Sequence, residues 1–176
     1  MVPNTDSARK FDFTLVIPCY NEVGAIEKTL ESITRSLKEN DNHEIIVVND
    51  GSDDGTGSIL KKVGHHYSTV RVLTHQQNRG YGAALKTGIR SANSELIVIT
   101  DADGTYPNER IIELVELCKD YDMVVGARIG KNVKYSKLRA FPKYFLKHWV
   151  SWLAGQKVPD INSGLRVFRK NVAEQF

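Results

Sequence analysis

Apolar residues over the first 127 positions alternate between short β-branched runs and longer stretches that are apolar on one face. The short runs predict buried strands over residues 13–17, 44–48, 70–73, 95–100 and 123–126. The stretches between them predict helices by spacing or by capping residues over 23–37, about 52–63, 80–92 and from Pro107 onward. This alternation is typical of an α/β fold in which a mainly parallel sheet is flanked by helices.

The rest of the chain adds one aromatic-rich helix, predicted over 138–153, and a last strand, predicted over 164–168. With 176 residues, 41% of them hydrophobic and 26% charged, the chain fits one folded domain, expected over 11–176. The polar residues 1–10 are expected to form a flexible N-terminal segment. No apolar run approaches the roughly 20 residues of a membrane-spanning helix.

The net charge of +3 conceals a strong asymmetry along the chain. Residues 123–159 contain eight Lys and Arg residues and no Asp or Glu, so this segment carries +8 and the rest of the chain −5. Such a division favours an anionic partner at one surface. A solvated basic face is the alternative interpretation.

Polar clusters follow three of the predicted strands, at 18–22, 49–53 and 101–105. Ligands of open parallel sheets bind beyond the carboxyl ends of the strands. We therefore expect these clusters to meet along one edge of the sheet. Gathering their carboxylates there is costly unless cations or hydrogen-bond donors are bound.

Asp101 and Asp103 are the strongest candidates for metal ligands. Two carboxylates one residue apart after a buried strand can serve a single divalent cation, and Mg²⁺ or Mn²⁺ commonly joins such carboxylates to substrate phosphates. Thr105 offers a third oxygen. The alternative is an ordinary turn, because Asp-Ala-Asp-Gly is also good turn chemistry.

The first two clusters are candidates for binding a nucleoside. Asp50 can accept a hydrogen bond from a base N–H, Tyr20 offers a ring for stacking, and Glu22 an acceptor for base or ribose. Pro18 shapes the turn that carries them. For residues 52–56 we favour a helix cap over a ligand role.

The segment Asn78–Ala84 contains closely spaced glycines but does not predict a dinucleotide-binding loop. The pattern would need Gly or Ala where Leu85 stands, and no acidic residue follows in register. We expect these small residues to allow close helix packing, with Arg79 and Lys86 as candidates for diphosphate contact.

Taken in order, the motifs at 18–22, 49–56, 78–80, 101–107, 126–128 and 160–166 resemble those of family 2 glycosyltransferases. The chain is most similar to dolichol-phosphate mannose synthase and the bacterial polyprenyl-phosphate glycosyltransferases. It differs from the mannose synthases at Gly104 and Thr105, where they have Leu-Gln. It also ends earlier than the family's catalytic domain normally does, which implies truncation at the C-terminus.

The resemblance implies a GT-A fold and an inverting transfer from a UDP- or GDP-sugar, with Mg²⁺ or Mn²⁺. Position by position, it implies a donor site and an acceptor-phosphate site. The donor site comprises Pro18, Tyr20, Glu22, Asp50, Asp101, Ala102 and Asp103, and Arg128 and Arg139 bind the acceptor phosphate. The implied acceptor is a polyprenyl or dolichyl phosphate.

Two other functions stay open. A hydroxyl acceptor on a polysaccharide would need a general base, and Asp160 is the candidate, with a turn role after Pro159 as its alternative. A non-catalytic module that binds nucleotide sugars is the second.

The predicted helix over 138–153 combines aromatic residues with lysines, as helices lying on a membrane surface do. A buried helix of the same domain is the alternative. With the basic segment, this composition predicts peripheral contact at the cytoplasmic face of a membrane. Nucleic acid is not an expected partner, because the acidic clusters would repel its phosphates.

Overall fold

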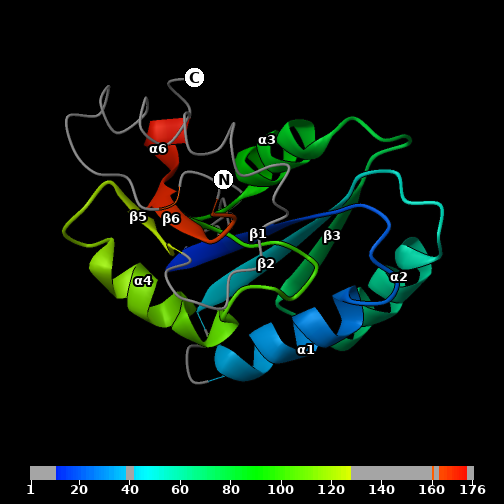
Figure 1. Cartoon of the computed structure of the whole chain (residues 1–176), viewed down its shortest axis with the longest axis horizontal. Coiled ribbons are helices and arrows are strands. Elements are labelled where there is room, and N and C mark those ends of the chain that lie inside the picture. The colour runs from blue at the N-terminus through cyan, green and yellow to red at the C-terminus, as the bar shows by residue number, and fades with distance from the viewer. Residues whose placement is uncertain (1–10, 39–41, 128–159, 161–162, 174–176) are drawn as a thin grey trace, which may run out of the picture.

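The computed structural model describes residues 11–38, 42–127, 160 and 163–173. Its centre is a six-stranded sheet in the order β3-β2-β1-β4-β6-β5 (Figure 1). The strands are β1 (Phe13–Cys19), β2 (His43–Asn49), β3 (Val70–Thr74), β4 (Leu96–Ile99), β5 (Met123–Val125) and β6 (Arg166–Arg169). The first four pair in parallel, whereas β6 runs antiparallel to both of its neighbours. The predicted mainly parallel α/β sheet is confirmed.

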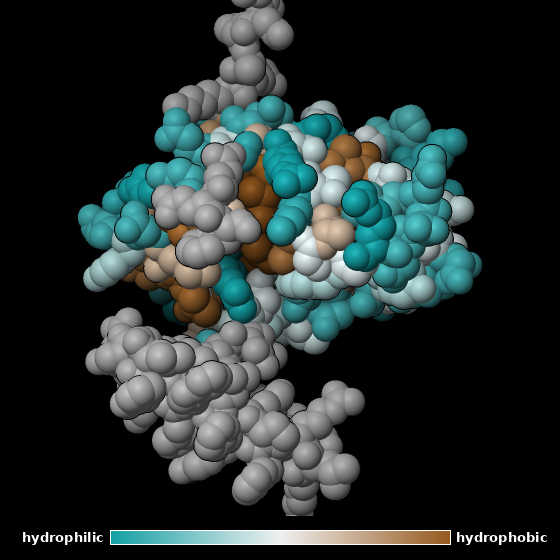
Figure 2. All heavy atoms as spheres, turned by 90° about the horizontal axis from the view of Figure 1, so that it is seen from above, coloured by the Kyte–Doolittle hydropathy of each residue, from teal (hydrophilic) through white to brown (hydrophobic). Residues whose placement is uncertain are grey.

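Helices cover both faces of this sheet. They are α1 (Ile26–Ser36), α2 (Thr56–His66), α3 (Tyr81–Ser91), the 3-10 helix η1 (Asn108–Arg110), α4 (Ile111–Leu117) and the short α6 (Lys170–Ala173). In Figure 1, α1, α2 and α4 lie below the sheet and α3 above it. The larger apolar core lies on the α1 side and a smaller one lies under α3. Seen from above, apolar residues gather in the middle of the face, with hydrophilic residues around them (Figure 2).

Of the small residues in Asn78–Ala84 that we predicted to allow close helix packing, Ala84 is buried, but a Cβ added to Gly80 or Gly82 would meet nothing within 4 Å. The close approach of α3 to the sheet occurs at Gly88, outside the predicted segment. A Cβ added to Gly88 would lie 2.4 Å from Cγ1 of Val16 on β1. Since that separation is far below van der Waals contact, only glycine fits at this crossing without displacing its neighbour. The packing fixes α3 over β1 and β2, with its first residue, Tyr81, at the carboxyl end of the sheet.

Several predicted boundaries differ from the observed ones. Strand β1 continues through Pro18 to Cys19. Helix α1 begins at Ile26 rather than Val23, because the N–H groups of Ala25 and Ile26 both donate to the carbonyl of Glu22 in a preceding turn. The helix predicted over 138–153 lies outside the described residues.

The amino end of the sheet holds a buried carboxylate, Glu44 of β2. It accepts hydrogen bonds from the Thr14 hydroxyl at 3.0 Å and from Arg71 Nη2 at 2.8 Å. The backbone N–H and the amide of Asn93 also donate to it, at 3.1 and 3.0 Å. Its negative charge is therefore matched by a cation and by several donors.

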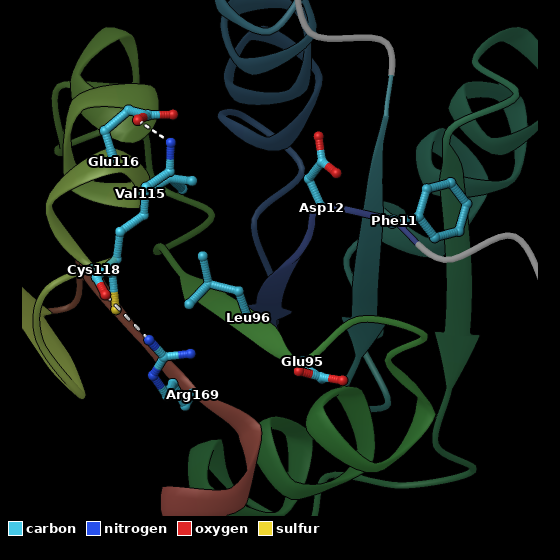
Figure 3. A pocket seen from close by; sticks show the side chains of 9 residues that line it. Phe11, Asp12, Glu95, Leu96, Val115, Glu116, Cys118 and Arg169 are labelled. Carbon is cyan, nitrogen blue, oxygen red and sulfur yellow. Dashed lines mark hydrogen bonds and ion pairs between the residues drawn. The ribbon is translucent and has the colours of Figure 1, made fainter.

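A hollow of about 680 Å³ lies near the start of β1 and β4. Figure 3 shows Asp12, Glu95, Leu96 and Arg169 around it. Its charged groups also have partners, since Arg169 donates to the carbonyl of Lys119 and lies 3.7 Å from Asp122.

Candidate active site

The loops after β1 and β2 are joined at the carboxyl end of the sheet. The backbone N–H of Asn21 donates to the Ser52 hydroxyl at 3.0 Å, and its side-chain amide donates to Asp53 at 2.9 Å. Asn21 adopts a left-handed conformation, with φ of 55°. Ser52 and Asp53 thus hold the neighbouring loop and do not cap α2, which corrects our prediction for them.

Asp54 fixes both loops to the start of α2. It accepts hydrogen bonds from the N–H of Val23 at 3.1 Å and from the N–H of Thr56 at 3.0 Å. These bonds, and above all the one from the Thr56 hydroxyl, lower the pKa of Asp54. The N-cap of α2 is Gly55, which makes no side-chain hydrogen bond. The side-chain cap predicted for residues 52–56 is therefore absent at the N-cap, and Asp54, one residue earlier, accepts from the first N–H of the helix instead.

The loop after β4 is hydrogen-bonded to α1, the helix that follows the loop after β1. The Thr29 hydroxyl donates to the backbone carbonyl of Ala102 at 2.9 Å. Asp103 Oδ1 accepts from the N–H and the hydroxyl of Thr105, at 3.0 and 2.8 Å. Gly104 between them has φ of 70°, a value that favours glycine. The loop is thus a tight turn that leaves the Asp103 carboxylate exposed.

The three loops, 20–22, 50–54 and 101–105, form an edge that we call the carboxyl rim. The pKa of Glu22 shows how close the carboxylates of this rim lie to one another. Partial burial first, and then the negative charges of Asp103, Asp54 and Asp101, raise the pKa of the Glu22 carboxyl. Carboxylates that are distant in the chain therefore share one electrostatic environment, as predicted from the strand ends.

Asp101 is confined from two sides. The Tyr81 hydroxyl of α3 donates to its Oδ1 at 3.2 Å. On the other side, a Cβ added to Gly164 would lie 2.3 Å from its Oδ2. Burial and the nearby Asp101 raise the pKa of Tyr81 to about 12, so the phenol remains a donor at neutral pH.

Gly164 and Tyr81 were not among the predicted site residues. Gly164 lies in the 160–166 motif, just before β6, and its N–H donates to the Tyr106 hydroxyl at 2.5 Å. Tyr81 lies in the glycine-containing segment that we interpreted as packing. Only the antiparallel placement of β6 beside β4 and the position of α3 bring these residues to Asp101, and neither follows from local sequence patterns.

Asp50 is buried, with 3% of its surface exposed. It accepts hydrogen bonds from His75 Nδ1 at 2.6 Å and from the N–H groups of Arg79 and Gly80, at 3.0 and 2.8 Å. Burial opposes its ionisation, but these donors outweigh burial and its pKa is lowered. Its carboxylate therefore holds the 75–81 segment. The role in accepting from a nucleoside base stays a prediction.

The remaining predicted residues divide into those at the rim and those that cannot be placed. Tyr20 is 44% exposed there, directly after the end of β1 and two residues after the buried Pro18. Asp160 is half-buried. Arg128 and Arg139 lie outside the described residues.

The donors at the rim suit a hard divalent cation. In the described part of the chain, no three His, Cys, Asp or Glu side chains lie close enough to hold a metal alone. Asp101 and Asp103 would supply two carboxylates, and substrate phosphates and water would complete the shell, as Mg²⁺ commonly binds. The like charges around Glu22 are what such a cation would neutralise.

Comparison with known proteins identifies the family. Residues 14–176 match the description "Glycosyl transferase family 2". The chain belongs to this family.

Relatives of this family member include a dolichyl-phosphate hexose transferase of Haloferax volcanii, 33% identical over 92% of the chain and 68% of that protein. A UDP-N-acetylglucosamine–dolichyl-phosphate N-acetylglucosaminyltransferase of Methanococcus voltae is 32% identical over 89% of the chain and 69% of its own length.

Among solved structures, a mannosyltransferase of Pyrobaculum calidifontis in complex with GDP-Man and Mn²⁺ superposes with a TM-score of 0.69. It is 26% identical, with 94% of this chain and 46% of that one covered. The chain thus spans about half of that protein. The predicted GT-A fold is confirmed.

The helices in the described part of this family member are all too short or too polar to span a bilayer.

Proposed function

We propose that the protein is an inverting glycosyltransferase that moves a sugar from a UDP- or GDP-sugar to a polyprenyl or dolichyl phosphate. The observation that carries this proposal is the carboxyl rim, where Glu22, Asp101 and Asp103 crowd at the ends of β1 and β4. Family membership supports sugar transfer. The names of two relatives, both acting on dolichyl phosphate, support the acceptor.

The donor's nucleoside would lie along the loops after β1 and β2. Tyr20 offers an exposed ring for stacking. Glu22 offers a polar acceptor two residues further on, and Pro18 lies in β1 just before this loop. Asp50 would act indirectly, because its carboxylate accepts hydrogen bonds that hold the backbone of Arg79 and Gly80 at the rim.

The diphosphate would lie over Asp101, Ala102 and Asp103. A Mg²⁺ or Mn²⁺ held there supplies Lewis-acid stabilisation of the negative charge that grows on the leaving diphosphate. The Mn²⁺ in the related mannosyltransferase structure supports this metal. Asp101 and Asp103 are the residues that would hold that ion, and the Thr105 hydroxyl, which donates to Asp103, keeps the Asp103 carboxylate in its turn.

The acceptor phosphate is anionic at neutral pH and therefore needs positioning rather than deprotonation. Arg128 and Arg139 would bind it, since guanidinium groups suit phosphate oxygens. They belong to the basic segment 123–159, which carries +8. We propose that this segment also brings the enzyme to the anionic cytoplasmic surface of a membrane.

Release of nucleoside diphosphate tests the proposal. The chain is incubated with GDP-mannose, UDP-glucose or UDP-N-acetylglucosamine, with Mn²⁺, and with either polyprenyl phosphate or the matching polyprenol. We expect release with one sugar nucleotide and only with the phosphate, and a product of inverted anomeric configuration. Equal release with the polyprenol would contradict the phosphate acceptor and favour Asp160 as a general base.

A further inference from the structure

The 75–81 segment connects two carboxylates that follow different strands. At its start, His75 donates to Asp50 at 2.6 Å and its other ring nitrogen lies 2.9 Å from the Thr87 hydroxyl of α3. At its end, the Tyr81 hydroxyl donates to Asp101 at 3.2 Å. The segment therefore spans the carboxyl rim from the end of β2 to the end of β4.

The backbone of this segment is held as tightly as its side chains. The N–H of His75 donates to the carbonyl of Asn49 at 2.9 Å. A Cβ added to Gly51 would lie 2.5 Å from the carbonyl carbon of Gln77, so the two loops touch through their backbones. Gly80 has φ of 89°, which lets the chain turn sharply into α3. Tyr81 consequently starts the helix in a fixed position.

Tyr81 contributes little to the core. It is 53% exposed and belongs to neither apolar cluster. A single hydrogen bond adds only modestly to stability, so the contact of the exposed Tyr81 with Asp101 points to a role beyond holding the fold together.

Asp101 needs such a constraint to serve a cation. A carboxylate that can rotate loses side-chain entropy when a metal binds, and a carboxylate already held loses less. Gly164 limits the movement of Oδ2, and Tyr81 holds Oδ1. Second-sphere hydrogen bonds of this kind commonly tune metal affinity.

We propose that Tyr81 is a positioning residue that fixes the Asp101 carboxylate for the divalent cation, and that the His75–Asp50 pair holds Tyr81 in place from the other end of the segment. This inference rests on the proposed function, because it assigns a cation to Asp101.

The test is a titration of the purified chain with Mn²⁺ in the presence of saturating GDP or UDP, followed by the EPR signal of free Mn²⁺. The Tyr81→Phe variant removes one hydroxyl and nothing else. We expect its Mn²⁺ dissociation constant to rise about 3- to 10-fold. Its metal-free nucleotide affinity and its melting temperature should match those of the parent. Tyr121→Phe, at an exposed tyrosine before β5, is the matched control and should change neither quantity.

A second variant tests the other end of the segment. His75→Asn should also weaken Mn²⁺ binding, whereas His65→Asn, on the exposed surface of α2, should not. If His75 acts through Tyr81, the Tyr81→Phe change should lower Mn²⁺ affinity less in the His75→Asn variant than it does in the parent.

The outcomes separate this inference from the proposed function. A parent protein with no nucleotide-dependent Mn²⁺ binding would overturn the proposed function and the role of Tyr81 together. A parent that binds Mn²⁺ and a Tyr81→Phe variant with the same affinity would overturn the role of Tyr81 alone. If Tyr81→Phe lowers the melting temperature enough to explain its entire loss of Mn²⁺ affinity, Tyr81 is a structural residue and the inference is contradicted.

Discussion

The carboxylates at the two ends of the sheet have opposite electrostatic surroundings. At the amino end, Glu44 is buried and has a cation and several donors as partners. At the carboxyl end, Glu22, Asp101 and Asp103 are less buried and lie close enough for their negative charges to act on one another. A carboxylate whose charge is matched by a cation and several donors stabilises the fold, whereas carboxylates whose negative charges act on one another favour binding of a cationic ligand.

The largest effect is expected at Asp103. Asp103→Ala removes one of the two carboxylates offered to the cation and should lower kcat/KM at least about 100-fold, a loss of roughly 3 kcal/mol of transition-state stabilisation. The melting temperature without metal should change little, because the loss of one repelling charge offsets the loss of two hydrogen bonds from Thr105. Steady-state kinetics and thermal unfolding measure both. If the variant had the same kinetics as the parent, a cation at the carboxyl rim would be contradicted.

The opposite behaviour is expected at Glu44. Glu44→Ala leaves the Thr14 hydroxyl and the Asn93 N–H without their acceptor and should cost about 2–3 kcal/mol of unfolding free energy. Arg71 is 42% exposed at its side chain, so its loss of a partner contributes less than a buried cation would. Urea unfolding measures the change. Nucleotide affinity should be unaffected. A loss of nucleotide affinity in this variant would contradict the separate roles that we assign to the carboxylates at the two ends of the sheet.

A smaller effect on binding is expected at Gly164. Gly164→Ala places a methyl group where the Asp101 carboxylate lies, so one of them must move. We expect Mn²⁺ affinity to fall about 10-fold, or roughly 1.4 kcal/mol. Gly126→Ala is the control, because the three atoms nearest to its added Cβ belong to the Leu165 side chain, the closest at 3.1 Å, and not to a carboxylate. Calorimetric titration with Mn²⁺ and nucleotide compares the two variants.

The smallest effect is the pH dependence that Glu22 confers. Its pKa in the folded protein lies above the ordinary value of 4.5. The folded state therefore binds its proton more tightly, and this contribution to stability is complete below about pH 4.5 and lost as pH rises through the folded pKa. Glu22→Gln should abolish this loss in the metal-free protein, a change below about 1 kcal/mol. Unfolding curves between pH 4.5 and 7.5 would reveal it, and identical pH profiles would contradict the crowding.

The sheet and the meeting of the acidic clusters were predictable because both follow from local patterns. Continuous apolar runs predicted five strands, and the rule that parallel strands end at the same edge predicted the rim. The antiparallel course of β6 between β4 and β5 was not predictable in this way, because strand order depends on packing between distant segments.

The roles of individual polar residues were less predictable than their location. Ser52 and Asp53 have the composition of a helix cap, yet they bind Asn21 of another loop. Asp50 has the position of a ligand, yet it accepts three hydrogen bonds from the 75–81 segment. Short polar side chains have many local partners of similar energy, and only the tertiary arrangement selects among them.

The place of β6 in the sheet has a consequence for synthesis on the ribosome. β5 ends at Val125, but its neighbour in the sheet begins at Arg166. At about 5–20 residues per second, the 40 residues between them take roughly 2–8 s to translate. During that interval β4 lacks its outer partner, and an open strand edge of this kind can pair with another nascent chain. Gly164 belongs to the same late segment, so the backbone that confines Asp101 is synthesised only after strands β1 to β5.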